Sequence, residues 1–192
     1  MLKKILFPII AIFLAYRSYE LLKTLWFVEP SELVLPIRIL LAFLLNLFIT
    51  GFFAFLGFAY KTNRILGENY YRIKNPNFIS RLSKLLKIEY FKKFLLLVFW
   101  GKEKNRQRYF DGTKLGLENF EYQTRQSEFG HLAALIVIQM VVFIMLLKQH
   151  YAIAFFTTIL NLISNFYPVI LQRNHRMQIS RIRNILNRKP SV

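Results

Sequence analysis

The chain has 192 residues, of which 55% are hydrophobic and 17% aromatic, and its formal net charge at pH 7 is +17. Soluble domains do not combine so apolar a composition with so large a positive charge, so we expect an integral membrane protein whose basic groups lie outside the bilayer. The chain has no cysteine. This excludes disulfides, cysteine nucleophiles that form thioesters, and thiolate metal sites.

The first sixty residues contain two apolar runs joined by a polar turn. The first run lacks the small residues of a signal-peptide cleavage site, so we expect an uncleaved membrane helix over residues 5–28. Glu29-Pro30-Ser31-Glu32 predicts a turn, and the second run predicts a helix over residues 35–60. The two helices are expected to form a transmembrane hairpin over residues 5–60. Asn46 in the second helix is predicted to hydrogen-bond to another helix.

Basic residues are concentrated between the two apolar halves of the chain. Residues 61–128 carry fifteen of the 27 lysines and arginines. The C-terminal segment 173–192 is also basic, whereas the turns near residues 29–36 and 148–150 carry a single lysine. The positive-inside rule therefore predicts four crossings, with both termini and the long connection in the cytoplasm.

Within this connection, residues 80–100 show the alternation of apolar and basic positions that is typical of an amphipathic helix. Ser80 is the expected N-cap. The run at residues 94–100 is too short to cross a bilayer, and its aromatic residues suit the membrane interface. We expect this helix to lie on the membrane surface and to attract anionic headgroups through Lys84, Lys87, Lys92 and Lys93. The chain has no nucleic-acid recognition motif, and no nucleic-acid partner is expected.

The third membrane run is preceded by a dense set of polar residues. Thr124, Glu128 and His131 follow helical spacings of four and three, so they share one stripe that leads into the apolar residues 132–147. Gln139 lies eleven residues beyond Glu128, which is almost a whole number of turns, and is predicted on the same face. A polar stripe that faced lipid would cost several kcal/mol, so we expect it to face protein or a water-filled pocket.

The last crossing carries a second polar stripe. Its members follow steps of three or four residues, and Pro168 is expected to kink the helix. The third and fourth crossings form a predicted hairpin over residues 129–172, in which the two stripes face each other around a cavity that opens to the cytoplasmic interface and to lipid. An alternative is that the asparagines only join neighbouring helices. The stripe consists of Thr158, Asn161, Asn165, Pro168, Gln172 and Arg176.

The predicted fold is an all-α integral membrane protein with four transmembrane helices, arranged as two hairpins, and a cytoplasmic interfacial amphipathic helix. It forms one membrane domain over residues 1–192. Its parts are the hairpins at 5–60 and 129–172, the basic connection at 61–128 and the basic tail at 173–192.

Two blocks of residues resemble a known family. The first is Thr124-Arg125-x-x-Glu128-x-x-His131, and the second, 34 residues later, is Asn165-x-x-Pro168-x-x-x-Gln172-Arg173-x-x-Arg176. Together with the basic tail they resemble the glycosyl-4,4'-diaponeurosporenoate acyltransferases, which are bacterial membrane proteins. The resemblance covers about the C-terminal half. It implies an O-acyltransferase in the bacterial inner membrane that moves a fatty acyl group onto a sugar hydroxyl of a lipid-embedded acceptor, such as a carotenoid glycoside.

The chemistry implied by this resemblance suggests roles for seven residues. A sugar hydroxyl is a poor nucleophile, so acyl transfer needs a base, and His131 is the candidate because its side chain titrates near neutral pH. Glu128 is expected to orient the imidazole from one turn away. Arginine side chains suit the phosphates of an acyl donor, and amides suit the oxyanion or the sugar. The binding candidates are Arg125, Asn165, Gln172, Arg173 and Arg176.

The resemblance implies no cofactor, and the co-substrate is an acyl donor such as an acyl thioester. No metal site is expected, because the zinc motif HExxH is absent. The expected partners are a bilayer with anionic headgroups, a lipid-embedded acceptor and the acyl donor. The sequence sets no oligomeric state. An alternative function is a non-catalytic small subunit, or a lipid-binding component, of a membrane complex, in which the polar stripes pack helices together.

Overall fold

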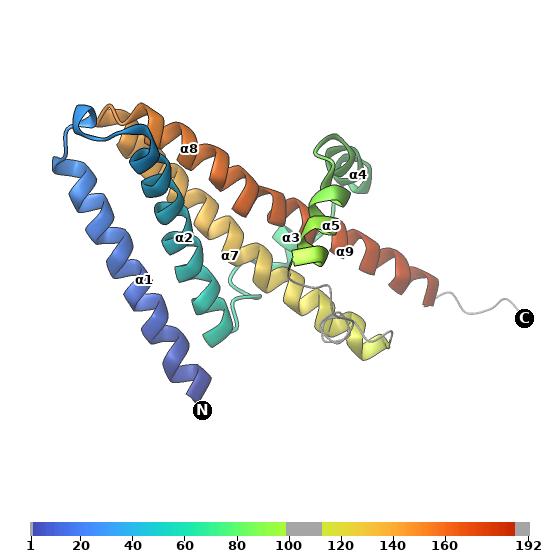
Figure 1. Cartoon of the computed structure of the whole chain (residues 1–192). Helices are drawn as coiled ribbons and strands as arrows, with labels where there is room; N and C mark the ends of the chain where they lie inside the picture. The colour runs from blue at the N-terminus through green and yellow to red at the C-terminus, as the bar shows by residue number, and fades with distance from the viewer. Residues whose placement is uncertain (1, 99–112, 187–192) are drawn as a thin grey trace, which may run out of the picture. The chain divides into compact units, whose positions relative to one another are not determined.

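The computed structural model describes residues 2–98 and 113–186, and within these ranges every regular element is helical (Figure 1). The expected end of the amphipathic helix at residues 99–100 and the last residues of the basic tail lie outside the described residues. The elements are α1 (Leu2–Phe27), the 3₁₀ turn η1 (Pro30–Glu32), α2 (Leu35–Ala59), α3 (Glu68–Tyr71), α4 (Pro76–Leu85), α5 (Ile88–Val98), α7 (Lys114–Leu147), α8 (Tyr151–Asn161), the π-helical turn η2 (Leu162–Phe166) and α9 (Tyr167–Leu186).

Four helical stretches among the described residues are long and apolar enough to cross a membrane. They are α1, α2, α7 and the stretch Tyr151–Leu186, in which α8, η2 and α9 follow one another without a break. The stretches agree with the predicted all-α membrane protein with four crossings. Each is at least 24 residues long, and about 20 residues suffice for a hydrocarbon core of about 30 Å.

The chain divides into two compact units. Unit 1 contains Met1–Thr62 and Gly130–Pro168, and unit 2 contains Asn63–Phe129 and Val169–Val192. The helix α7 and the stretch Tyr151–Leu186 each contribute residues to both units, so each unit is assembled from segments far apart in the sequence.

In unit 1, α2 packs against α1 on one side and against α8 on the other (Figure 1). The core of this unit is aliphatic, and its members include Leu25, Leu45, Ile138, Met145 and Ile153. Gly51 allows α1 and α2 to approach closely, since a Cβ atom at this position would lie 2.8 Å from Cδ1 of Leu14. Asn46 donates to the carbonyl of Thr157 at 3.2 Å, which is the predicted hydrogen bond between helices.

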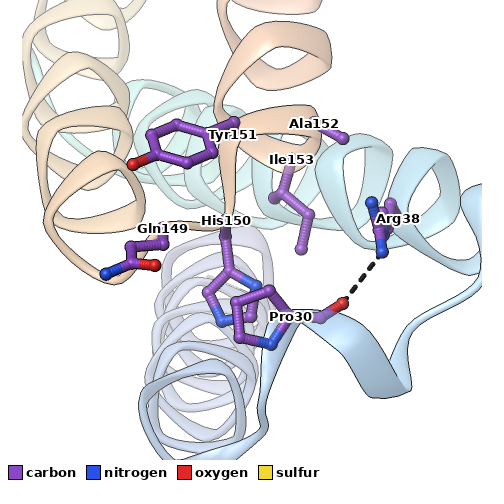
Figure 2. Close-up of a pocket in the computed structure, with 7 residues that line it drawn as sticks. All are labelled: Pro30, Arg38, Gln149, His150, Tyr151, Ala152 and Ile153. Carbon is purple, nitrogen blue, oxygen red and sulfur yellow. Dashed lines mark hydrogen bonds between the residues drawn. The ribbon is translucent and has the colours of Figure 1, made fainter.

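The turns of unit 1 are held by side chains that bind backbone carbonyls. Arg38 donates to the carbonyl of Leu33 at 2.7 Å and to that of Pro30 at 2.9 Å. His150 is buried, and its Nε2 atom lies 2.9 Å from the carbonyl of Leu25. Because a carbonyl only accepts, Nε2 carries the proton. Figure 2 shows both side chains beside a small cavity of about 70 Å³. These contacts give His150 a structural role, which the sequence did not predict.

In unit 2, the amphipathic segment is two helices rather than one. The expected helix over 80–100 instead begins at Pro76, and its N-cap is Asn75, whose side chain accepts from the backbone N–H of Phe78 at 3.0 Å. Ser80, the predicted N-cap, lies inside α4. An asparagine followed by proline is a strong start signal, because it supplies both the cap and a first residue that needs no N–H partner. The segment then breaks at Lys87, whose φ of 51° is left-handed, and α5 begins at Ile88.

Pro168 is accommodated by a π-helical turn. Its ring would clash with the carbonyl four residues earlier, at Ser164. The chain forms the wider turn η2 immediately before the proline and continues as α9 to Leu186. A π-helical turn inserts one residue into the helical repeat. The residues of the predicted polar stripe, from Thr158 to Arg176, are therefore not all related by one uninterrupted α-helical repeat.

Candidate active site

In unit 1, a chain of hydrogen bonds leads from α7 through η2 to α8. The Nδ1 atom of His131, on α7, lies 3.1 Å from Oδ1 of Asn165, on η2. The amide nitrogen of Asn165 donates to Oδ1 of Asn161 at 3.0 Å, and that of Asn161 donates to the carbonyl of Leu135 at 3.1 Å. Thr50 of α2 also contacts this series of hydrogen bonds, because its hydroxyl oxygen lies 3.0 Å from the Asn165 amide nitrogen. Both asparagines are buried.

This chain of hydrogen bonds determines which imidazole nitrogen of His131 carries the proton. The carbonyl of Leu135 can only accept, so the nitrogen of the Asn161 amide faces it and the oxygen faces Asn165. Asn165 therefore donates to Asn161, and its own oxygen faces the imidazole. An oxygen at that position requires Nδ1 of His131 to carry the proton. His131 also hydrogen-bonds the backbone of Ser164. In the neutral imidazole with its proton on Nδ1, Nε2 is the nitrogen that holds the lone pair.

The π-helical turn is what places Asn165 in this chain. It spans Leu162–Phe166, and Asn165 is its buried member. Single π-helical turns inside α-helices are frequent at functional sites, because they redirect side chains that a regular helix would space evenly. Here the turn directs an amide toward His131.

In unit 2, Glu128 is at the centre of a buried charged cluster. Its side chain is fully buried, and it accepts from the hydroxyl of Tyr70 at 2.9 Å, from Nε of Arg173 at 2.9 Å and from a terminal nitrogen of Arg176. The guanidinium of Arg173 also lies over the Tyr70 ring, 4.9 Å from its centroid. A carboxylate without charged partners would be costly at this depth, and the two arginines supply them.

Two tyrosines of α3 complete this cluster. Burial raises the pKa of Tyr70, and the nearby Glu128 carboxylate raises it further. The same two causes raise the pKa of Tyr71 to about 12. Both hydroxyls are therefore protonated at neutral pH, and they donate: Tyr70 to Glu128, and Tyr71 to the backbone carbonyl of Arg125.

Residues 67–185, more than half of the chain, match the family model of the glycosyl-4,4'-diaponeurosporenoate acyltransferases. The chain belongs to this family. The matched segment contains all seven residues singled out in the sequence, together with Tyr70 and Tyr71. No curated protein and no solved structure matches the chain.

Two groups of the predicted site residues are in contact in the acyltransferase structure. His131 and Asn165 are hydrogen-bonded in unit 1, and Glu128 binds both Arg173 and Arg176 in unit 2. Nδ1 of His131 has Asn165 as its partner, whereas the Glu128 oxygens are bound by the arginines and by Tyr70. The proposal that Glu128 orients His131 stays a prediction.

The remaining predicted site residues, Arg125 and Gln172, belong to unit 2. Arg125 is paired with Glu121 at 2.7 Å and with Glu68. The Arg125 guanidinium lowers the pKa of the Glu68 carboxyl by hydrogen bonding and by its charge. Gln172 donates to the hydroxyl of Ser127 at 3.3 Å, one residue before Glu128.

Gln139 does not share the buried face and is exposed. The expectation of a continuous polar stripe was wrong at this position. Ile138, the preceding residue, is fully buried in the aliphatic core. Successive residues on a helix are rotated by about 100°, so Gln139 points away from that core.

The sequence missed Tyr70 and Tyr71. They lie on a four-residue helix, which is too short to show any periodicity. The one available signal was their position inside the family's matched segment. Among the described residues, no group of three His, Cys, Asp or Glu side chains could hold a metal ion.

Proposed function

We propose that this protein is a membrane O-acyltransferase that moves a fatty acyl group from an acyl thioester onto a hydroxyl of a glycosylated lipid, such as a carotenoid glycoside. Membership of the acyltransferase family supports the reaction class. The observation that carries the proposal is the hydrogen bond of His131 to Asn165, because it leaves the Nε2 lone pair for a hydroxyl proton.

The proposed reaction is a direct transfer. As the acceptor oxygen attacks the thioester carbonyl, Nε2 of His131 takes the hydroxyl proton. The tetrahedral intermediate then collapses, the carbon–sulfur bond breaks, and the departing thiolate takes the proton back from Nε2. Asn165 accepts from Nδ1–H throughout and stabilises the imidazolium that forms between the two transfers.

The other site residues are proposed to hold the substrates. Arg125, Arg173 and Arg176 are candidates for the phosphates of the donor, since guanidinium groups bind phosphate in a bidentate manner. Gln172 is the candidate donor to the oxyanion or the sugar. Asn165 is less suited to that role, because its amide nitrogen already donates to Asn161. The expected orientation of His131 by Glu128 is not part of this mechanism, because Asn165 holds Nδ1–H and Nε2 faces the acceptor.

We further propose the membrane arrangement in which this chemistry takes place. The four spanning stretches form two hairpins in the bacterial inner membrane, with both termini in the cytoplasm. The segment of α4 and α5 lies at the interface, which its exposed apolar side chains support: Tyr90 is 71% exposed, Phe94 57% and Leu97 82%. The lysines of this segment would then contact anionic headgroups.

The test compares lipid and pigment extracts from cells that produce the wild-type chain, the His131→Ala variant or neither, by mass spectrometry. We expect a species heavier by one fatty acyl group with the wild-type chain alone. A full yield with His131→Ala would eliminate the base. If no acylated species depends on the chain, the activity itself is wrong.

The alternative function is a non-catalytic subunit or lipid-binding component of a membrane complex. It is favoured by one feature of unit 1, in which Asn46 and Asn161 both donate to backbone carbonyls, a contact typical of helix packing. In that case His131→Ala would lower the amount of folded protein or its assembly with partners. An enzyme would instead lose turnover at an unchanged protein level.

A further inference from the structure

Unit 2 contains a cavity of about 240 Å³ that is separate from the Glu128 carboxylate. Arginine side chains from three different segments line it: Arg72 follows α3, Arg125 belongs to α7, and Arg176 and Arg183 belong to α9. Arg173, one of the expected phosphate-binding residues, is not among the lining residues. Its partner is Glu128.

The charges around this cavity are not balanced. The lining contains four arginines and two carboxylates, Glu68 and Glu121. Arg176 also pairs with Glu128, which Arg173 binds as well, so five arginines and three carboxylates together leave a surplus of two positive charges. Glu121 binds both Arg125 and Arg183, and Glu68 binds Arg125. Arg72 is exposed, and among the described residues its side chain makes no hydrogen bond or ion pair, although its backbone N–H donates to the carbonyl of Glu68 at 3.0 Å. The surplus favours a ligand with two negative charges.

Donor groups at the cavity are also unused. The side chain of Arg176 is only 4% exposed, and its Nε and Nη1 atoms have no hydrogen-bond partner among the described residues. The Nε atom of Arg125 is also buried and has no hydrogen-bond partner among the described residues. A buried guanidinium N–H without an acceptor is unfavourable, so both side chains keep unused donor capacity beside the cavity.

The two arginines are held in place before any ligand arrives. Their guanidinium carbons each lie 5.2 Å from the centroid of the buried Tyr71 ring. Tyr71 in turn donates to the backbone carbonyl of Arg125. Glu68 and Glu121 fix the outer nitrogens of Arg125. A ligand would pay little for ordering these side chains, which is the benefit of a preorganised site.

We propose that this cavity binds a phosphate or diphosphate group. A fork of planar guanidinium donors matches the oxygens of a phosphate, and a dianion matches the surplus of two charges. The Ser180 hydroxyl, also in the lining, adds a neutral donor. The inference deepens the proposed function and rests on it for the identity of the ligand: the phosphates belong either to the acyl carrier or to a phospholipid headgroup.

The experiment titrates pyrophosphate into the purified full chain in detergent and measures the heat of binding and the unfolding temperature. Sodium chloride at matched ionic strength is the reference. We expect saturable binding to the wild-type chain and at least a tenfold weaker affinity for the double variant Arg72→Gln, Arg183→Gln. The control is Arg81→Gln, which removes one positive charge from the exposed face of α4 and is expected to bind like the wild type.

The proposal is overturned if pyrophosphate has no effect beyond that of chloride, or if Arg81→Gln weakens binding as much as the double variant. Competition then identifies the source of the phosphate. Displacement by coenzyme A indicates a soluble carrier, and displacement by phosphatidylglycerol in mixed micelles indicates a headgroup. Displacement by neither would overturn the link to the donor. The same titration on His131→Ala separates the two proposals. The phosphate-binding proposal depends on binding alone, so it stands if this variant binds pyrophosphate without turnover, even if the acyltransferase proposal fails.

Discussion

Nδ1 of His131 lies 3.1 Å from Oδ1 of Asn165, although 34 residues separate them in the sequence. The amide of Asn161 sets the orientation of Asn165, and through it the tautomer of the imidazole. This relationship makes the reactivity of one nitrogen atom depend on two asparagines that never need to touch the substrate.

The first prediction concerns the base. Replacing His131 by Gln should lower acyl transfer by about 10²- to 10⁴-fold, which is the usual contribution of general acid–base catalysis. His175→Gln is the matched control, because His175 lies on α9 outside the hydrogen-bond chain. Its activity should stay close to that of the wild type. Turnover by purified protein in lipid nanodiscs, normalised to folded protein, measures both variants, and equal losses would contradict a specific role for His131.

The second prediction concerns the tautomer. Asn161→Leu removes the group that orients Asn165, so Nδ1–H and Nε2–H forms of His131 should both become populated. Nitrogen NMR of histidine-labelled protein should show the single Nδ1–H form in the wild type and a mixture in the variant. The catalytic rate should fall while the Michaelis constant changes little. An unchanged spectrum in Asn161→Leu would contradict the proposed effect of Asn161 on the His131 tautomer.

The third prediction concerns the buried cluster of unit 2. Glu128→Gln leaves Arg176, which is 4% exposed, without its charged partner. Removing one partner of a buried ion pair typically costs about 3 to 5 kcal/mol of unfolding free energy. Glu89→Gln is the control, since Glu89 is 60% exposed and pairs with Lys92 at 3.8 Å on the surface of α5. Such a pair contributes about 0 to 1 kcal/mol.

Chemical unfolding in detergent, followed by circular dichroism, compares these two glutamate variants. If the two variants have equal free energies of unfolding, Glu128 does not stabilise the buried cluster. If Glu128→Gln is stable but inactive, the expected catalytic role of Glu128 gains support over the structural one.

The fourth prediction concerns alkaline pH. The pKa of Tyr71 is raised from 10.0 to about 12 in the folded chain. The folded state therefore holds this proton more tightly than the unfolded state, and the resulting stability is present below pH 10 and is lost as the pH rises toward 12. Ultraviolet titration of tyrosinate should show late-titrating groups, and Tyr71→Phe should show one fewer, since the pKa of Tyr70 is raised as well. A wild-type chain in which all tyrosines titrate near 10.0 would contradict the burial of this hydroxyl.

The fifth prediction concerns the start of α4. Asn75→Ala should destabilise the first turn by about 0.5 to 2 kcal/mol, because the side chain no longer accepts from the N–H of Phe78. Ser80→Ala, a change within the helix, should have almost no effect. Amide hydrogen exchange at Phe78 is the measurement, and faster exchange in Ser80→Ala than in Asn75→Ala would contradict the observed cap.

The sequence by itself determined which segments are helical and apolar, and it singled out His131, Asn165 and the arginines around Glu128. These inferences depend on local information, since hydrophobic length and a repeat of three or four residues are properties of a single segment. The family was also recognisable from two short blocks, and the match over residues 67–185 confirms it.

The tertiary structure alone decided which groups pair. Spacing along α7 places Glu128 and His131 one turn apart, but a side chain bonds to whatever partner the packing brings within reach. The π-helical turn that carries Asn165, the left-handed residue Lys87 and the four-residue helix with Tyr70 leave no periodic signal in the sequence. Contacts between segments far apart in the sequence then assemble the hydrogen-bond chain of unit 1 and the arginine-lined cavity of unit 2.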